Sequence, residues 1–216
     1  MKIVQCWDDG IVSDIPLIAI LTKYNAKATF NLNAGINKEV RHVIWNNNGQ
    51  DVVALAKSEL NEVYQGFDIA NHSLTHPMLT NMPIEEANHE IVENKRQLEA
   101  IFNREIKGFC YPFGGTNDDI STLVELADHS YARTVGKDDD LTNFGRNRFK
   151  FNPTCHILDD DFWQRYEQAR EVGVFYFWGH SYEFTSPEMW QEFENKISKI
   201  NNDPDAEWES LCNIYQ

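Results

Sequence analysis

The sequence predicts an α/β fold built on a parallel sheet, either closed as a barrel or open and doubly wound. Short apolar runs of strand character alternate with helical patterns along the 216 residues. Candidate site residues follow four of the predicted strands: Asp8-Asp9, His72, Phe113 and His180. In both architectures functional side chains gather at the carboxyl ends of parallel strands. We therefore expect one site at that end of the sheet.

The first half of the chain begins with an apolar-leaning strand that stops at Asp8-Asp9-Gly10. A helix follows, with Leu17, Leu21 and Tyr24 on one face. Residues 41–50 are polar and asparagine-rich, which favours a loop. In order, we expect a strand at 2–7, a helix at 14–24, a strand at 27–32, a loop at 41–50, a helix at 52–60 and a strand at 66–73.

The second half continues the alternation. Pro83 suits the first position of a long helix, and Ser186 with Pro187 marks another helix start. The charged stretch 136–150, with two glycines, is expected to be a surface loop and a candidate for substrate contact. In order, we expect a helix at 83–102, a strand at 108–112, a helix at 117–127, a strand at 130–135, the loop, a strand at 151–157, a helix at 159–170, a strand at 174–179, and helices beginning at 186 and 203.

Composition is that of one soluble globular domain spanning residues 1–216, with 42% hydrophobic and 25% charged residues. A net charge of -15 argues against nucleic acid or anionic membranes as partners, because phosphate binding needs a basic face. We find no apolar run of transmembrane length and no secretory signal, so we expect a cytoplasmic protein without a membrane span. The four cysteines are widely spaced without a C-x-x-C pair, which indicates free thiols rather than a disulfide framework or zinc finger.

The turn after the first strand carries two adjacent carboxylates, Asp8 and Asp9, and then Gly10, which permits a sharp turn. Two neighbouring carboxylates repel one another, so a fold that keeps them together gives them different environments. One is a candidate metal ligand and the other a candidate base. The alternative is a solvated Asp-Asp-Gly turn.

His72 and His76 are spaced i and i+4, a spacing found in many zinc sites. The alternative is a pair of ordinary hydrogen-bonded histidines. Two imidazoles and the Asp9 carboxylate would leave coordination positions open for water and substrate. Asp8 would then be placed to accept the water's proton.

Four motifs in this order, Asp-Asp-Gly, His-Ser-x-x-His, Tyr-Pro-Phe-Gly and an apolar strand ending in His180, resemble those of the polysaccharide deacetylases, the NodB-homology carbohydrate esterases. The resemblance covers roughly residues 2 to 185. It implies a distorted (β/α)7 TIM-like barrel. It also implies a hydrolase of carbon–nitrogen bonds that removes N-acetyl groups from sugars with a divalent metal, zinc first, or cobalt, nickel or iron.

The resemblance also assigns roles to residues. Asp8 matches the catalytic base. Tyr111 and Phe113 lie in the third motif, where the Phe113 N–H would hold the oxyanion. His180 matches the general acid, and Trp178 a residue lining the acetyl pocket. The matching metal ligands are Asp9, His72 and His76.

Three departures from the family pattern stand out. Cys110 occupies the place of an arginine that pairs with the base, and Arg146 or Arg148 are candidate substitutes. The Asp-Trp fourth motif has no clear match, and its candidate stand-ins are Asp138, Asp139, Asp140 and Glu183. Trp178 replaces a leucine, which suggests a narrower acyl pocket.

The expected substrate is an N-acylated amino sugar in a glycan or a surface-polysaccharide precursor. Two alternatives stay open: a deformylase or cyclic-amide hydrolase on the same scaffold, and a non-catalytic carbohydrate-binding module. Tyr111 and Phe113 also have the plainer interpretation of core residues. The remaining histidines are expected to be structural or at the surface: His42, His89, His129 and His156.

Overall fold

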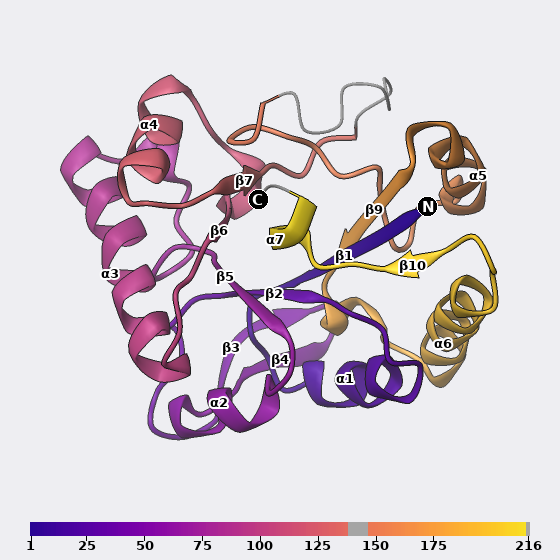
Figure 1. Ribbon diagram of the computed structural model, residues 1–216. Coiled ribbons are helices and arrows are strands. Elements are labelled where there is room, and N and C mark those ends of the chain that lie inside the picture. Colours follow the sequence, from indigo (N-terminus) through magenta and orange to yellow (C-terminus); the bar gives the residue numbers. More distant parts are fainter. Residues whose placement is uncertain (138–146, 215–216) are drawn as a thin grey trace.

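The computed structural model describes residues 1–137 and 147–214 and shows a curled parallel sheet surrounded by helices (Figure 1). Its hydrogen-bonded order is β7-β6-β5-β2-β1-β9-β8, and each neighbouring pair is parallel. These strands are β7 (Tyr131–Arg133), β6 (Gly108–Cys110), β5 (Asp68–Asn71), β2 (Thr29–Leu32), β1 (Lys2–Asp8), β9 (Val174–Gly179) and β8 (Cys155–His156). β1 lies inside the sheet and is buried along most of its length, as an apolar strand covered on both faces should be.

The chain that leads into β8 touches both edge regions of the sheet. The amide of Thr134, directly after β7, donates to the carbonyl of Phe151 at 2.9 Å. Three residues later, the amide of Thr154 donates to the carbonyl of Tyr176 in β9 at 2.7 Å. The sheet therefore curls towards a ring. This confirms the expected distorted (β/α)7 barrel rather than the alternative, an open doubly wound sheet.

Helices lie outside the strands, and most fall where the apolar patterns predict them (Figure 1). The longest, α3, turns Ala87, Ile91 and Leu98 towards the sheet. The predicted start of α6 is also confirmed, because the Ser186 side chain accepts a hydrogen bond from the Met189 amide. The helices around the sheet are α1 (Asp14–Lys23), α2 (Leu60–Val63), α3 (Ile84–Phe102), α4 (Asp118–Leu126), α5 (Phe162–Val172) and α6 (Pro187–Asn201).

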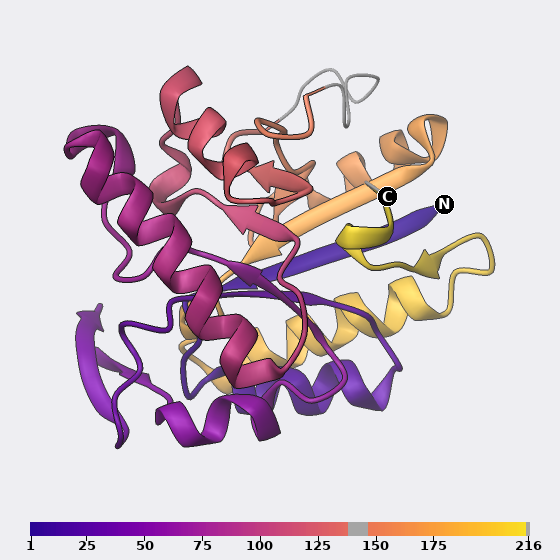
Figure 2. The same cartoon turned by 60° about the vertical axis from the view of Figure 1, so that its left-hand side comes forward.

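The expected loop at 41–50 and helix at 52–60 are wrong. These residues form an antiparallel hairpin of β3 (His42–Asn47) and β4 (Gln50–Ala54). Its turn is Asn48-Gly49, with φ of 50° and 89°. An Asn-Gly pair with positive φ at both positions suits a two-residue hairpin turn, and the high asparagine content concealed that signal. Figure 2 shows the hairpin at the opposite end of the molecule from both termini.

The helix expected from Asp203 is also wrong. A turn there, in which the Ala206 amide donates to the Asp203 carbonyl, leads into β10 (Glu207–Trp208) and then α7 (Leu211–Ile214). β10 pairs in parallel with Lys2 and Ile3, whereas β2 pairs with β1 only from Cys6 onwards. The end of the described chain thus supplies the hydrogen bonds that β2 does not provide at the start of β1.

The main core fills the space between the sheet and the helices. Trp7 of β1 is completely buried, and its ring meets those of Phe177 and Phe193 at centroid distances of 6.5 and 5.2 Å. This packing fixes the carboxyl end of β1 beside that of β9. Within the described ranges, none of the helices combines the length and apolarity that crossing a membrane requires.

Candidate metal centre and active-site pocket

A pocket of about 410 Å³ lies at the carboxyl ends of the central strands. Its lining contains all eight site residues expected from the sequence: Asp8, Asp9, His72, His76, Tyr111, Phe113, Trp178 and His180. Three further residues complete it: Trp45 of the hairpin, Val135 and Tyr182. Strands far apart in sequence thus bring the predicted residues to one place.

The backbone after β1 explains how two adjacent carboxylates share this pocket. Neighbouring side chains of a regular strand point to opposite faces. Asp9 departs from the strand with a φ of 85°, and Gly10 follows with 70°. A side chain at Gly10 would lie 2.9 Å from Leu32, so both conformation and space favour glycine.

Asp9, His72 and His76 converge as a set of metal ligands. The Nε2 atoms of His72 and His76 lie 3.1 Å apart. Oδ1 of Asp9 is 3.7 Å from Nε2 of His72 and 3.6 Å from Nε2 of His76. Ligand atoms around a tetrahedral zinc at about 2.1 Å are about 3.4 Å from one another. Among the described residues, Oδ1 of Asp9 has no hydrogen-bond partner although it is buried. This donor set fits a divalent metal.

The protonation of the two histidines agrees with that assignment. Burial lowers the pKa of His72 to about 3 and also lowers the pKa of His76, so both imidazoles are neutral near pH 7. Burial raises the pKa of Asp9 to about 7, because the cost of ionising a buried carboxylate beside Asp8 exceeds the stabilisation that His180 provides. A metal ion would supply that positive charge.

Neighbouring groups orient the histidine turn. Nδ1 of His72 lies 2.8 Å from the carbonyl of Cys110, so it carries the proton and leaves the Nε2 lone pair free. Glu90 of α3 accepts hydrogen bonds from the Thr75 amide at 2.8 Å and its hydroxyl at 2.7 Å. His76 has a φ of 61°, so the two imidazoles meet through a tight left-handed turn rather than the helical turn that their spacing suggested.

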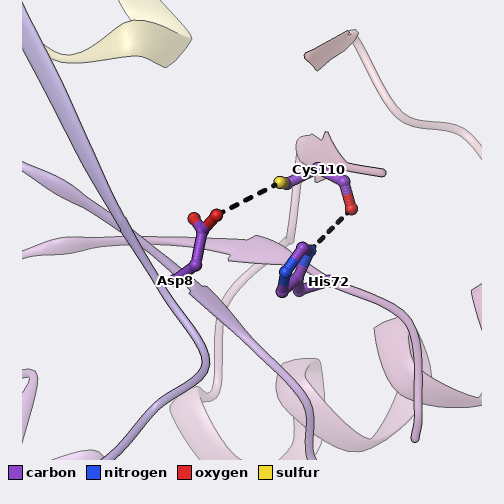
Figure 3. A group of neighbouring side chains, drawn as sticks. All are labelled: Asp8, His72 and Cys110. Carbon is purple, nitrogen blue, oxygen red and sulfur yellow. Dashed lines mark hydrogen bonds between the residues drawn. The ribbon is translucent and has the colours of Figure 1, made fainter. Parts of the chain in front are cut away.

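A second set of ligand atoms, from Asp8, His72 and Cys110, lies close by (Figure 3). The Cys110 sulfur is 3.9 Å from Oδ2 of Asp8, and burial raises the thiol pKa well above its ordinary value. Nε2 of His72 faces Asp9 instead, while Nδ1 is bonded to the Cys110 backbone. The neutral thiol and the occupied Nδ1 make this the poorer set.

Arg133, the last residue of β7, pairs with Asp8. Its Nη2 lies 2.5 Å from both carboxylate oxygens, and the side chains of Arg133 and Asp8 are 1% and 2% exposed. Asn31 donates a further hydrogen bond to Oδ1 at 2.6 Å. Burial by itself would raise the pKa of Asp8, but Arg133, with His72 and His180, holds it well below its usual range. Asp8 is therefore a carboxylate near neutral pH.

Arg133 thus supplies the charge that Cys110 cannot. The expectation that Arg148 would do so is wrong, because its guanidinium lies 3.6 Å from Glu125 and is largely exposed. Arg146 lies outside the described residues. Arg133 escaped notice because an arginine buried in a sheet is unusual, although its place inside the strand predicted at 130–135 was an available signal.

His180 faces both carboxylates of the first motif. Its Nε2 is 3.9 Å from Oδ2 of Asp8 and 4.0 Å from Oδ2 of Asp9. Its Nδ1 is 3.3 Å from Oε2 of Glu183, which also accepts the His180 backbone N–H at 2.9 Å. Burial lowers the pKa of His180, but Glu183, Asp8 and Asp9 outweigh that effect and raise it to about 9.

Of the four candidate stand-ins for the fourth motif, Glu183 lies at the site, while Asp138, Asp139 and Asp140 fall outside the described residues. Nε2 of His156 lies 3.0 Å from Oε2 of Glu183. The Leu158 amide donates to Nδ1 of His156, so Nε2 bears the proton that reaches Glu183. The expectation that His156 is merely structural or superficial is therefore incomplete, because it holds the partner of His180.

The aromatic residues divide into buried and accessible ones. Tyr111 is fully buried and donates to the Phe149 carbonyl at 2.9 Å, so its packing role is substantial. Phe113 is 59% exposed, has a φ of 56° and sets its ring 4.6 Å from that of His76. The Arg133 guanidinium lies over the Trp178 ring at 4.7 Å. Trp45 and Tyr182, which the sequence did not single out, meet edge to face at 5.6 Å.

Similarity to solved structures supports the fold. One similar structure is the Xyl-CE4 domain of a multidomain xylanase from the hindgut metagenome of Trinervitermes trinervoides. The two chains are 18% identical, with a TM-score of 0.64, over 99% of this chain and 89% of the other. With the Streptococcus pyogenes deacetylase PplD in complex with acetate, it shares 22% identity and a TM-score of 0.54 over 68% of this chain and 61% of that one. The chain thus spans about three fifths of the length of PplD.

The same fold also includes a protein described as a pseudoenzyme. A mutant of BA3943, a CE4 family pseudoenzyme with restored enzymatic activity, is 14% identical over all of this chain and 67% of the other, with a TM-score of 0.63. At such identities the likeness establishes the fold alone, and the site residues must decide the chemistry.

Sequence comparison identifies the family. Among curated proteins, none matches this chain significantly. The family model described as polysaccharide deacetylase matches residues 1–132. That stretch is more than half of the 216 residues and includes the first three motifs. The chain therefore belongs to the polysaccharide deacetylase family, as its motifs led us to expect.

Proposed function

We propose that this chain is a metal-dependent hydrolase that removes the N-acetyl group from an amino sugar of a glycan or a surface-polysaccharide precursor. The observation that carries the proposal is the convergence of Asp9, His72 and His76 beside an ionised Asp8. A metal-binding group and a separate carboxylate in one pocket are what amide hydrolysis by water requires.

The proposed metal ligands are Asp9, His72 and His76, and their N2O donor set favours zinc. A divalent metal held there would lower the pKa of a bound water and polarise the amide carbonyl. Its ligands come from two rigid places in the chain, the end of β1 and the turn anchored by Glu90.

Asp8 is the proposed base. It is kept ionised by Arg133 and Asn31, both of which leave it fixed in orientation. Its task is to accept a proton from the attacking water, which needs a carboxylate with a free lone pair facing the substrate. His180 lies on the other side of the same pocket, 3.9 Å from Asp8.

His180 is the proposed acid. Glu183, whose pKa is lowered to about 2 by its bonds to His156 and His180 despite burial, is an anion facing Nδ1. A proton on Nδ1 directed at that anion leaves Nε2–H to protonate the departing amine. The Phe113 N–H, in its left-handed turn at the pocket, is proposed to hold the developing oxyanion.

The pocket walls support an uncharged, ring-shaped substrate. Trp45, Phe113, Trp178 and Tyr182 supply aromatic surface, and the only arginine beside them is already paired with Asp8 within the described chain. Such walls suit the apolar face of a sugar ring. The acyl group is proposed to point towards Trp178, where a bulky ring leaves room for a small acyl chain.

Metal content and acetate release are the first measurements. We expect one equivalent of zinc per chain and acetate release from N-acetylglucosamine oligomers. Asp8→Asn should retain the metal and lose at least about 100-fold in kcat, the usual scale for removing a general base. Asp119→Asn, at an exposed site on α4, is the matched control and should behave as wild type.

The other outcomes separate the alternatives. Metal binding without acetate release would redirect the assay to formylated amino sugars and cyclic amides. Failure to bind zinc, cobalt or nickel would overturn the mechanism, and sugar binding without hydrolysis would then favour a carbohydrate-binding module.

A further inference from the structure

The buried face of α3 carries two polar residues, Glu90 and Asn94, one helical turn apart in an otherwise apolar stripe. Glu90 is 8% exposed and Asn94 is fully buried. A buried amide is costly unless it is hydrogen-bonded, so its partners show what it is there to hold. Glu90 holds the histidine turn, residues 72–76, through Thr75. The partners of Asn94 lie at the base of the same turn.

Asn94 joins α3 to two strands of the sheet. Its side-chain oxygen accepts the Ala34 amide at 2.7 Å, and Nδ2 donates to the Leu32 carbonyl at the end of β2 at 2.8 Å. Nδ2 also donates to Oδ1 of Asn71 at 2.6 Å. Asn71 is the last residue of β5 and directly precedes the proposed ligand His72. A helix that provides none of the proposed ligands is thus bonded to the residue next to one.

The side chain of Asn71 has all of its hydrogen-bonding positions filled. Besides Asn94, Oδ1 accepts the Ser73 amide at 2.9 Å, which fixes the first residue after His72. Nδ2 donates to the Ile91 carbonyl of α3 at 2.8 Å. Its second hydrogen points to an imidazole nitrogen. An amide with four partners has one orientation, and a fully bonded buried network is rigid.

That imidazole belongs to His129, which ends the network. Nδ1 of His129 lies 3.0 Å from the Val124 carbonyl and carries the proton, so Nε2 accepts from Asn71 at 3.1 Å. Burial lowers the pKa of His129 to about 4, so the ring is neutral near pH 7 and keeps its lone pair. The network therefore runs from the histidine turn through α3 to the end of α4.

Asn33, directly after β2, holds the turn from the other side. Its Nδ2 donates to the carbonyls of His72 and Ser73, the second at 2.9 Å. Within the described part of the chain, Oδ1 of Asn33 is buried without a hydrogen-bond partner. An unpaired buried oxygen opposes folding. The favourable contribution of this amide thus lies in the two bonds that its nitrogen makes to the histidine turn.

We propose that Asn33, Asn71 and Asn94 are positioning residues of the metal centre and hold His72 in the geometry that binds the metal. α3 acts as the frame of a site to which it gives no ligand. A ligand that is already held in place does not have to be ordered when the metal binds, so the network raises metal affinity. The inference rests on the metal site of the proposed function, but on neither its substrate nor its reaction.

Two variants remove the network from different sides. Asn94→Leu keeps a side chain of similar size and removes the three bonds from α3. Asn33→Ala removes the two bonds from the β2 side, and its cost in stability should be smaller because the unpaired Oδ1 goes as well. The matched control is Leu98→Ala, because Leu98 is fully buried one turn further along α3 and packs in the main core.

The measurements are zinc affinity, by competition with a chromophoric chelator, and the visible spectrum of the cobalt-loaded protein, which reports ligand geometry. We expect Asn94→Leu and Asn33→Ala to weaken zinc affinity by about tenfold or more and to alter the cobalt spectrum. Leu98→Ala should lower the midpoint of urea denaturation and leave the zinc affinity and the cobalt spectrum unchanged. If Asn94→Leu does not fold, Asn33→Ala decides the question.

Two results would overturn the positioning role. One is wild-type zinc affinity and cobalt spectrum in variants that circular dichroism shows to be folded. The other is an equal loss of affinity in Leu98→Ala, because general loosening of the fold would then explain the effect.

The same measurements separate this role from the proposed function. If both variants weaken zinc binding but the wild type releases no acetate, the positioning role stands and the hydrolase proposal fails. If the wild type releases acetate and the variants bind zinc as tightly as it does, the hydrolase proposal stands and the positioning role is overturned. A wild type that binds neither zinc, cobalt nor nickel would overturn both.

Discussion

Replacing Arg133 by methionine should destabilise the protein more than the loss of a surface ion pair does. The change leaves the Asp8 carboxylate, only 2% exposed, without the guanidinium that lies 2.5 Å from its oxygens. Charge centres about 4 Å apart at an effective dielectric constant of ~20 attract by about 4 kcal/mol. Breaking a buried pair by removing one partner costs roughly 3–5 kcal/mol, which agrees. We expect the free energy of unfolding to fall by about that amount.

Urea denaturation followed by circular dichroism measures this change. Arg96→Met is the matched control, because Arg96 pairs with Glu93 on the surface of α3 with 67% of its side chain exposed. Its cost should stay below about 1 kcal/mol. The double variant Asp8→Asn/Arg133→Met should cost clearly less than the sum of its single changes, since it leaves no uncompensated buried charge.

Two results would refute this reasoning. One is an Arg133→Met variant that is no less stable than Arg96→Met. The other is a double variant whose cost equals the sum of the single changes to within about 0.5 kcal/mol, which would mean that Asp8 and Arg133 do not interact. Either result would mean that Arg133 is not the group that keeps Asp8 ionised.

Further predictions concern the metal centre and the buried acid beneath it. Asp9→Ala should bind no stoichiometric zinc by elemental analysis, because it removes the only carboxylate ligand of the proposed triad, whereas His89→Ala, on the exposed face of α3, should bind one equivalent. Zinc retained by Asp9→Ala would place the metal elsewhere. Glu90→Gln should weaken zinc affinity by about 10- to 100-fold, because the anion that holds the Thr75 turn is lost; equal affinity in a competition titration would show that the turn is fixed without it. Burial raises the pKa of Asp14 to about 6, although the hydrogen bonds that Ser181 and Tyr64 donate to its carboxylate act to lower it. The folded state therefore binds the Asp14 proton more tightly than the unfolded chain does. The free energy of unfolding of the wild type should therefore fall by ~3 kcal/mol as pH rises from about 4 to about 6. Asp14→Asn should lack that part of the fall, and parallel pH profiles for the two proteins would contradict it.

The sequence by itself determined the parts of this protein that depend on local pattern. Alternating apolar runs placed the strands of the sheet, and the rule that parallel strands present their carboxyl ends together predicted one site. The Asp-Asp-Gly and His-Ser-x-x-His motifs then identified the residues that the fold assembles, and all eight expected site residues line one pocket. Each of these inferences needed only neighbours in the chain.

Other features were local but concealed. The Asn48-Gly49 turn is a short-range signal for a hairpin, yet the polar composition around it favoured a loop. Because the hairpin was not predicted, Trp45 was also overlooked, since a tryptophan in an expected loop has no predicted neighbours. β10 had no such signal, since this two-residue strand depends on pairing with Lys2 and Ile3, where β2 does not reach β1.

Only the tertiary structure decided which distant residues meet. Arg133 reaches Asp8 across 125 positions of sequence, and His156 reaches Glu183 from a different strand. Nothing in spacing or periodicity encodes such pairs, because the curl of the sheet and the order of its strands set the distances. The ion pair that keeps Asp8 a carboxylate and the contacts that orient His180 are consequences of that closure, whereas the proposed site residues themselves could be named from local motifs.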